Sequence, residues 1–236
     1  RRRGGSTCPA EVGGAIMSSA VQASAFERSS SDAPPVVVKL GGSVVRSGSL
    51  VGWLDALVGI QRPIVLVPGG GALADEVRDC QRQLGFGDVT AHRMALLAMD
   101  QLAWAIAGVR DGCEVGTTEE DLRQSLRRGH IAVWAPSAFL SNRPDVEPTW
   151  RLTSDSLALW LAGRLEAAFC CVVKSAPISQ RSWSATALSD EGIVDQGFPA
   201  MLKETGVATM VFGQGDENNL TAFLAGQQPV PSPVTV

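Results

Sequence analysis

Short, unbroken apolar runs separated by longer segments of helical character are the feature that most constrains this fold. Five such runs are predicted to be strands: Val36–Leu40, Ile64–Val67, Ile131–Ala135, Phe169–Val173 and Ala208–Phe212. A continuous apolar run, rather than an alternating one, is typical of a parallel sheet whose two faces are both covered. We therefore predict an α/β fold, a three-layer α/β/α sandwich with a mainly parallel central sheet.

The segments between these runs carry helical signals. Apolar side chains recur along one helical face after Gly71, at Leu73, Val77, Cys80 and Leu84. Capping residues predict further helix starts at Thr118, Asp155 and Asp216. The segment Thr90–Val109 is apolar nearly all round. We expect it to be buried, either in the core or at a subunit interface.

The two ends of the chain differ in composition from its middle. Residues 1–35 are rich in Ser, Ala and Gly and end in two prolines, so we expect a disordered leader, with Met17 as a candidate start. Residues 227–236 contain three prolines and are expected to form a flexible tail. Residues 36–226 are then predicted to form a single domain.

Charge and apolar patterning exclude several classes of function. A net charge of −4 and a pI of about 5.2 argue against non-specific nucleic-acid binding, which needs a basic surface. No apolar stretch approaches the roughly 18 residues of a membrane span, and the N-terminal region lacks the apolar core of a signal peptide. The five cysteines form no CxxC pair and no zinc-ligand spacing. We expect a soluble cytoplasmic protein with reduced, buried thiols and no membrane or nucleic-acid partner.

Three of the predicted strands end in unusual loops. K-L-G-G-S at 39–43 and P-G-G-G at 68–71 are rich in glycine, and V-K-S at 173–175 brings a second lysine. In an open parallel sheet, ligands bind outside the carboxyl ends of the strands. Glycines allow backbone N–H groups to approach an anion, and a helix that starts after Gly71 adds its positive end. The loops therefore predict a site for phosphate groups, and a polyphosphate suits it better than a neutral ligand.

Lys39 is a charged residue within an otherwise apolar run. Removing an ammonium group from water costs several kcal/mol unless an opposite charge accompanies it. Lys39 must therefore have a partner in the fold.

Other readings of these motifs are less favoured. No P-loop sequence GxxxxGK[ST] occurs, whereas G-x-G-x-x-A does occur at Gly69, Gly71 and Ala74. A dinucleotide-binding unit should continue into a strand ending in an acidic residue, but residues 85–94 lead into another helix. We expect His92 and His130 to be surface or packing residues, and the six tryptophans, Trp150 among them, to pack in the core or at its rim.

The ordered set of motifs resembles the amino acid kinase superfamily. The set comprises K-L-G-G-S, P-G-G-G, L-T-S-D-S-L-A-L-W-L-A-G-R-L at 152–165 and V-V-K-S, and the resemblance runs from about Val36 to Gly213. It implies that Lys39 contacts the transferring phosphoryl group and that Asp155 orients the catalytic lysines. Such a carboxylate would also keep Lys39 charged. The resemblance also implies Mg²⁺-ATP as a substrate, since family members use it, often with the metal held mainly by phosphates.

The resemblance extends these roles to further residues. The glycine loops and the start of the 154–165 helix are assigned to substrate binding: Gly41, Gly42, Ser43, Gly69, Gly70, Gly71, Thr153 and Ser154. Lys174, which is also counted as catalytic, Ser175 and Lys203 are assigned to nucleotide binding. Lys203 matches only approximately, because the family's G-G-M-x-x-K becomes G-F-P-A-M-L-K here. The acceptor half would cover about 36–150 and the nucleotide half about 151–226, in a protein expected to be a homo-oligomer.

Residues 92–101, T-S-D-S and V-D-Q-G-F-P at 194–199 resemble one branch of the superfamily. That branch includes the [5-(aminomethyl)furan-3-yl]methyl phosphate kinase of methanofuran biosynthesis. The implied activity is ATP-dependent phosphorylation of a small phosphate monoester to its diphosphate. The alternatives are a kinase for UMP or an amino-acid carboxylate, a non-catalytic nucleotide- or oxoanion-binding protein on the same fold, and a nicotinamide-dependent oxidoreductase.

Overall fold

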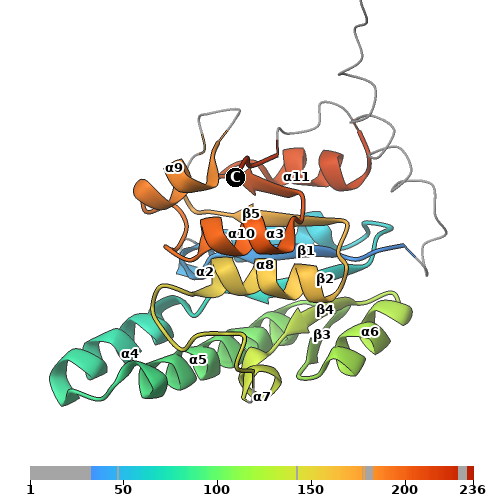
Figure 1. Cartoon of the computed structure of the whole chain (residues 1–236). Coiled ribbons are helices and arrows are strands. Elements are labelled where there is room, and N and C mark those ends of the chain that lie inside the picture. The colour runs from blue at the N-terminus through green and yellow to red at the C-terminus, as the bar shows by residue number, and fades with distance from the viewer. Residues whose placement is uncertain (1–32, 47, 142, 177, 179–182, 228–232) are drawn as a thin grey trace, which may run out of the picture.

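A six-stranded, all-parallel sheet forms the centre of the molecule in the order β3-β4-β2-β1-β5-β6 (Figure 1). The computed structural model describes residues 33–46, 48–141, 143–176, 178, 183–227 and 233–236. The strands are β1 (Val36–Leu40), β2 (Ile64–Pro68), β3 (Cys113–Gly116), β4 (Ile131–Trp134), β5 (Phe169–Val173) and β6 (Thr209–Phe212).

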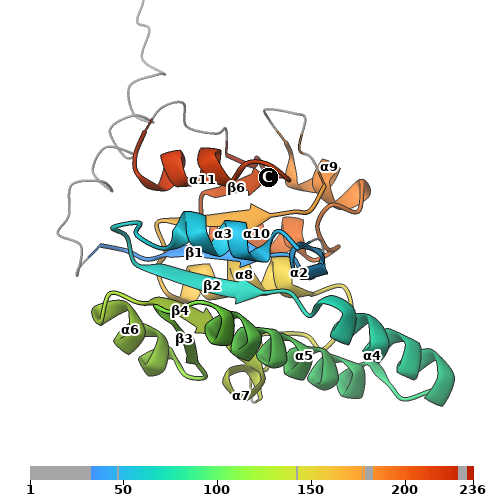
Figure 2. The same ribbon diagram turned by 180° about the vertical axis from the view of Figure 1, so that it is seen from behind.

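The helices cover both faces of this sheet. They are α2 (Gly42–Arg46), α3 (Leu50–Leu57), α4 (Gly71–Leu84), α5 (Asp88–Val109), α6 (Glu119–Arg127), α7 (Pro136–Leu140), α8 (Ser154–Arg164), α9 (Ala185–Asp190), α10 (Phe198–Thr205) and α11 (Glu217–Leu224). Helices α8 and α10 lie over one face in Figure 1, and α3 lies over the other in Figure 2. The predicted three-layer α/β/α sandwich is confirmed.

Alternate residues of each central strand point into separate cores. Cys170 packs in the core beneath α8 and α10, whereas Cys171 packs in the core beneath α3 and α11. Every residue of β1, β2 and β5 is buried, Lys39 included. Burial on both faces explains why these strands read as unbroken apolar runs.

Among the strands of the described residues, β3, at the edge of the sheet, is the one that the sequence did not predict. It is four residues long, and its two middle residues, including Glu114, are only half-buried. An edge strand pairs on one side, so its sequence needs no continuous apolar run. The five strands that the sequence did predict lie where expected, to within one residue at either end.

Two of the predicted apolar helix faces are partly exposed. In α4 the face carrying Leu73 and Leu84 was expected to pack, yet Leu84 is 76% exposed. Burial of α5 within the core is incomplete, because one side of the helix is exposed at Val89, Leu97 and Trp104, and its last residue, Val109, is exposed too. Burial of that side at a subunit interface stays a prediction. The helix packs across the part of the sheet formed by β2, β4 and β3, and the side that faces these strands, which includes Ala103 and Ile106, is buried (Figure 2).

The predicted ends of the chain fall partly outside the described residues. Residues 1–32, which include Met17, and residues 228–232 are not described. Residues 233–236 are not loose, contrary to the expectation of a flexible tail. Val234 is buried and its N–H donates to Thr209 O at 2.7 Å, while Thr235 bridges to Ser184.

The register of the sheet determines where the site residues meet. Leu40, at the end of β1, pairs with Pro68 of β2 on one side and with Val173 of β5 on the other. The loops that follow these three strands therefore leave the same edge as neighbours. Among the described helices, none combines the length and the apolarity that crossing a bilayer requires.

Candidate active site

A cavity of about 830 Å³ opens at the carboxyl ends of β1, β2 and β5. Its lining includes every predicted site residue except Lys203: Lys39, Gly41, Gly42, Ser43, Gly69, Gly70, Gly71, Thr153, Ser154, Asp155, Lys174 and Ser175. Lys203 lies in the last turn of α10, where it is exposed. A role for Lys203 in nucleotide binding stays a prediction that no contact with this cavity supports.

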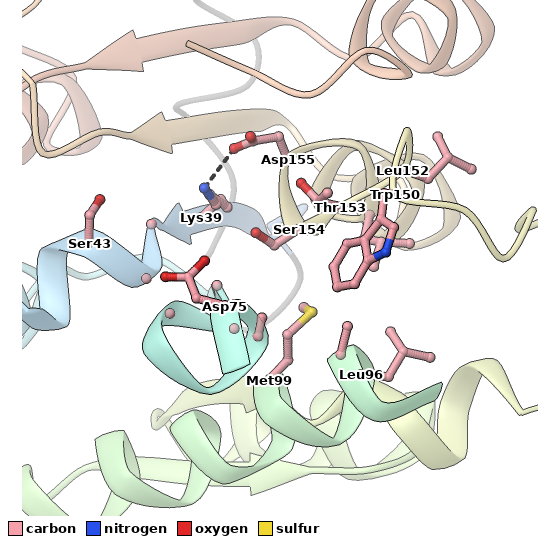
Figure 3. Close-up of a pocket in the computed structure, with 18 of the residues that line it drawn as sticks. Lys39, Ser43, Asp75, Leu96, Met99, Trp150, Leu152, Thr153, Ser154 and Asp155 are labelled. Carbon is pink, nitrogen blue, oxygen red and sulfur yellow. Dashed lines mark ion pairs between the residues drawn. The ribbon is translucent and has the colours of Figure 1, made fainter. Parts of the chain in front are cut away.

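Two lysines share one buried carboxylate at the base of the cavity. Lys39 Nζ, on β1, lies 2.6 Å from Asp155 Oδ1 in the first turn of α8 (Figure 3). Lys174 Nζ, just after β5, lies 2.8 Å from Asp155 Oδ2. Lys39 is only 3% exposed and Asp155 5%. The Lys39–Asp155–Lys174 cluster is thus the ion pairing that the buried Lys39 requires.

The cluster has more positive than negative charge. Burial alone would raise the pKa of Asp155, but the charges and hydrogen bonds of the two lysines outweigh it and hold that pKa at about 2. Burial, and then the charge of Lys39, lower the pKa of Lys174 to about 8 against the attraction of Asp155. With both lysines protonated, two positive charges face one negative charge. The surplus suits an anionic ligand.

The two glycine loops touch each other directly. A Cβ at Gly42 would lie 2.2 Å from Gly71 Cα, and one at Gly69 would lie 2.5 Å from Gly42 N. Gly71 also has φ +54°, a conformation that disfavours other residues. These positions therefore need glycine to let two backbone segments meet. Together the loops form one continuous surface beside Lys39.

Two of the glycine N–H groups that were predicted to bind an anion already donate hydrogen bonds to main-chain carbonyls. Gly41 N–H donates to Val173 O at 3.2 Å, and Gly69 N–H donates to Leu40 O at 2.8 Å, so both tie the loops to the sheet. Within the described ranges, the N–H groups of Gly42, Gly70 and Gly71 have no such acceptor. They lie at or beside the start of α4, where the helix dipole is positive. An anion would be bound by these groups.

Asp195 fixes the start of α8 and was missed by sequence reasoning. Its carboxylate accepts hydrogen bonds from Thr153 N at 2.9 Å, Thr153 Oγ1 at 2.8 Å and Ser156 N at 3.0 Å, and also from Ser156 Oγ. Thr153 itself makes no side-chain cap. Burial, and then the nearby Asp155, raise the pKa of Asp195. Because Asp195 lies about forty positions away, no local capping pattern could reveal it.

The far side of the cavity is apolar and aromatic. Leu96, Met99, Trp150 and Leu152 line it together with the half-buried His92, whose pKa burial lowers. Trp150 was expected to pack in the core or at its rim, and His92 to be a surface or packing residue; the structure places both on the cavity wall. A tryptophan in an irregular segment carries no local signal of which surface it faces.

The described residues contain no group of three or more His, Cys, Asp and Glu side chains that could hold a metal ion. Both oxygens of Asp155 are occupied by lysines. Asp75, the other carboxylate in the cavity lining, pairs with Arg78 at 2.9 Å. A metal at this site would therefore depend mainly on ligand oxygens.

Comparison with known proteins gives the family of this chain. Residues 34–177 match the amino acid kinase family. The [5-(aminomethyl)furan-3-yl]methyl phosphate kinase of Methanocaldococcus jannaschii is 30% identical over 134 residues, which cover 55% of this chain and 61% of that protein. The chain thus aligns with less than two thirds of that relative.

Solved structures share the fold at lower identity. The uridylate kinase of Archaeoglobus fulgidus superposes with a TM-score of 0.64 at 18% identity, over 85% of this chain and 98% of the other. The UMP kinase of Bacillus anthracis gives a TM-score of 0.62 at 15% identity, over 86% and 96%. At these identities the likeness concerns the fold alone.

Proposed function

This chain belongs to the amino acid kinase family, and we propose that it is an ATP-dependent phosphotransferase whose acceptor is a small phosphate monoester. The observation that carries the proposal is the Lys39–Asp155–Lys174 cluster set against two touching glycine loops. Phosphoryl transfer depends chiefly on positioning and on neutralising charge at the phosphoryl oxygens. The two lysines and the backbone N–H groups beside them can supply both the positioning and the neutralising charge.

Each part of the site has a role in this proposal. Lys39 and Lys174 are held at rest by Asp155, and both would contact phosphate oxygens once substrates bind, so the cations are charged and positioned in advance. Gly42, Gly70 and Gly71 would donate N–H groups to phosphate, and the N-terminus of α4 adds its dipole. ATP supplies the phosphoryl group, and Mg²⁺ bound to its phosphates supplies further positive charge.

The proposed reaction forms a diphosphate. An oxygen of the acceptor phosphate forms a bond to the γ-phosphorus of ATP as the bond from that phosphorus to the β–γ bridging oxygen breaks. The electron pair of the broken bond leaves with ADP. Two anionic groups meet during this step, which is why a site with surplus positive charge and two glycine loops favours a phosphate acceptor over a neutral one.

The proposed acceptor is [5-(aminomethyl)furan-3-yl]methyl phosphate. Its support is the 30% identity to the Methanocaldococcus jannaschii kinase named for that compound. The acceptor would occupy the side of the cavity formed by residues 36–150, and the nucleotide would occupy the side of Lys174 and Ser175. Residues 177 and 179–182, which follow Ser175, are outside the described residues.

An ADP-release screen tests this function. The acceptors are the furan phosphate, UMP, acetylglutamate and aspartate, with ATP and Mg²⁺ in excess. We expect acceptor-dependent ADP release with the furan phosphate, and Lys39→Ala should lower kcat by roughly a hundredfold or more. Arg127→Ala, an exposed residue of α6, is the control and should match the wild type.

Two results would contradict the proposal. Full activity in Lys39→Ala would remove the assigned role of Lys39. Saturable ATP binding without ADP release for any acceptor would instead indicate a non-catalytic nucleotide- or oxoanion-binding protein on the same fold.

A further inference from the structure

The cavity that holds the charge cluster has a second end of opposite character. Lys39, Lys174 and the glycine loops make one end polar and cationic, whereas Leu96, Met99, Trp150 and Leu152 make the other apolar. Figure 3 shows the indole of Trp150 beside Met99 and Leu96, away from Lys39. A ligand whose phosphate is held near Lys39 would therefore project the rest of its structure toward this apolar end.

Trp150 is held in one orientation by side chains of α4. The guanidinium of Arg78 lies over its ring, 4.2 Å from the centroid. Its indole N–H donates to Gln81 Oε1 at 2.6 Å, and Gln81 Nε2 donates in turn to Asp88 at 2.8 Å. Arg78 is itself paired with Asp75. An aromatic ring whose orientation is already fixed by a cation–π contact and a hydrogen bond loses little conformational freedom when a ligand stacks on it.

The same contacts use some of the polar groups near the apolar end. The single N–H of the indole donates to Gln81, and the guanidinium of Arg78 stacks on Trp150 and donates to Asp75. The side chains of Leu96, Met99 and Leu152 offer no hydrogen bonds. His92 adds a polar side chain to this end, but a sugar placed here would leave most of its hydroxyl groups without partners, which is unfavourable in a desolvated site. The ring of the proposed acceptor needs no such partners, and its aminomethyl group is the one polar substituent apart from the phosphate.

Resting on the proposed kinase function, we infer that Trp150 selects the acceptor by stacking on a flat unsaturated ring. The preferred class is a phosphate monoester in which one methylene joins the phosphate to an aromatic or heteroaromatic ring. Nucleoside monophosphates are disfavoured because a ribose separates their phosphate from the base. Trp150 is thus a specificity-determining residue, distinct from the charge cluster that acts on the phosphoryl group.

Two substitutions separate stacking from packing. Trp150→Phe keeps a flat ring and loses only the hydrogen bond to Gln81, whereas Trp150→Leu keeps apolar bulk and loses the ring. The acceptors are [5-(aminomethyl)furan-3-yl]methyl phosphate and benzyl phosphate, which carry a ring, and ethyl phosphate, which does not. Loss of one aromatic stacking partner is worth roughly a ten- to hundredfold change in affinity.

We expect Trp150→Leu to lower kcat/KM for both ring-bearing acceptors by about ten- to hundredfold, mainly through KM. Its effects on kcat/KM for ethyl phosphate and on KM for ATP should be much smaller, and Trp150→Phe should retain most of the wild-type preference. An equal loss with all three acceptors would assign Trp150 a packing role. No loss with any of them would also overturn the inference.

A binding measurement keeps this inference separate from the proposed function. Calorimetric titration of the wild type and Trp150→Leu with benzyl phosphate, ethyl phosphate and UMP requires no turnover. Tighter binding of benzyl phosphate than of the other two, lost in Trp150→Leu, would support ring recognition even in a protein that transfers no phosphoryl group. Equal affinities for all three in the wild type would contradict it, whatever the kinetics show.

Discussion

Lys39 lies in the central strand of the sheet at 3% exposure, a position in which an unpaired ammonium group would be strongly destabilising. The apolar run around it predicted the burial. That Asp155 is the partner could be anticipated only from family resemblance, because the two residues lie more than a hundred positions apart. The sharing of Asp155 between Lys39 and Lys174 agrees with the implied role of Asp155 in orienting the catalytic lysines. It depends on β1 and β5 being neighbours in the sheet.

Deprotonation of Lys174 should limit activity at alkaline pH. Its pKa is lowered to about 8 by burial and by Lys39, and Asp155 and Asp195 oppose that shift. The proposed reaction uses the protonated form, which is present below that pKa and lost as the pH rises through it. We therefore expect kcat/KM to fall by about tenfold per unit above roughly pH 8 in a pH–rate profile.

Lys174→Arg is the matched variant for this profile. An arginine stays charged throughout the range, so the alkaline decline should disappear even if the changed geometry lowers the overall rate. An identical decline in Lys174→Arg and the wild type would assign the titration to another group.

Replacement of Asp155 by Asn should destabilise the fold. The substitution keeps the size of the side chain and leaves two buried ammonium groups without a counter-charge. We expect the free energy of unfolding, measured by urea denaturation at neutral pH, to fall by about 3–5 kcal/mol. Asp79→Asn removes a carboxylate from an exposed ion pair and should change it by less than about 0.5 kcal/mol. Similar losses in the two variants would argue against a stabilising role for the buried cluster.

At the scale of elements, predictability follows burial. Strands β1 and β5 were predicted to the residue because both of their faces are buried, and β3 was missed because it is a half-exposed edge strand. The start of α6 was predicted from a local signal, since Thr118 and Asp121 form a capping box. The start of α8 was located, but its tertiary cap by Asp195 could not be predicted, because that contact exists only in the folded chain.

The outward side of α5 should mediate self-association. Val89, Leu97 and Trp104 are each more than half exposed on this side of the helix, and an apolar surface of this kind is a common contact surface. We expect light scattering at tens of micromolar protein to show a homo-oligomer, and Trp104→Glu to shift it to the monomer. Trp104→Phe is the control and should remain associated. A monomeric wild type at that concentration would contradict the expectation.

At the scale of the whole molecule, the position of the cavity follows from the topology of the sheet. The two glycine loops and both lysines were predicted to converge because parallel strands present their carboxyl ends at one edge, and the cavity contains all of them. The aromatic end of the same cavity was not predicted. Trp150 lies in an irregular segment, and its orientation depends on contacts with α4 that no sequence pattern encodes.

Phosphorus NMR of the reaction products tests the central claim most directly. The chain is incubated with ATP, Mg²⁺ and [5-(aminomethyl)furan-3-yl]methyl phosphate, and the phosphorus spectrum is followed with time. We predict that the acceptor's single phosphate signal is replaced by the two coupled doublets of a diphosphate ester, in step with an equal amount of ADP. Formation of ADP and inorganic phosphate with the acceptor signal unchanged would contradict phosphoryl transfer to this acceptor.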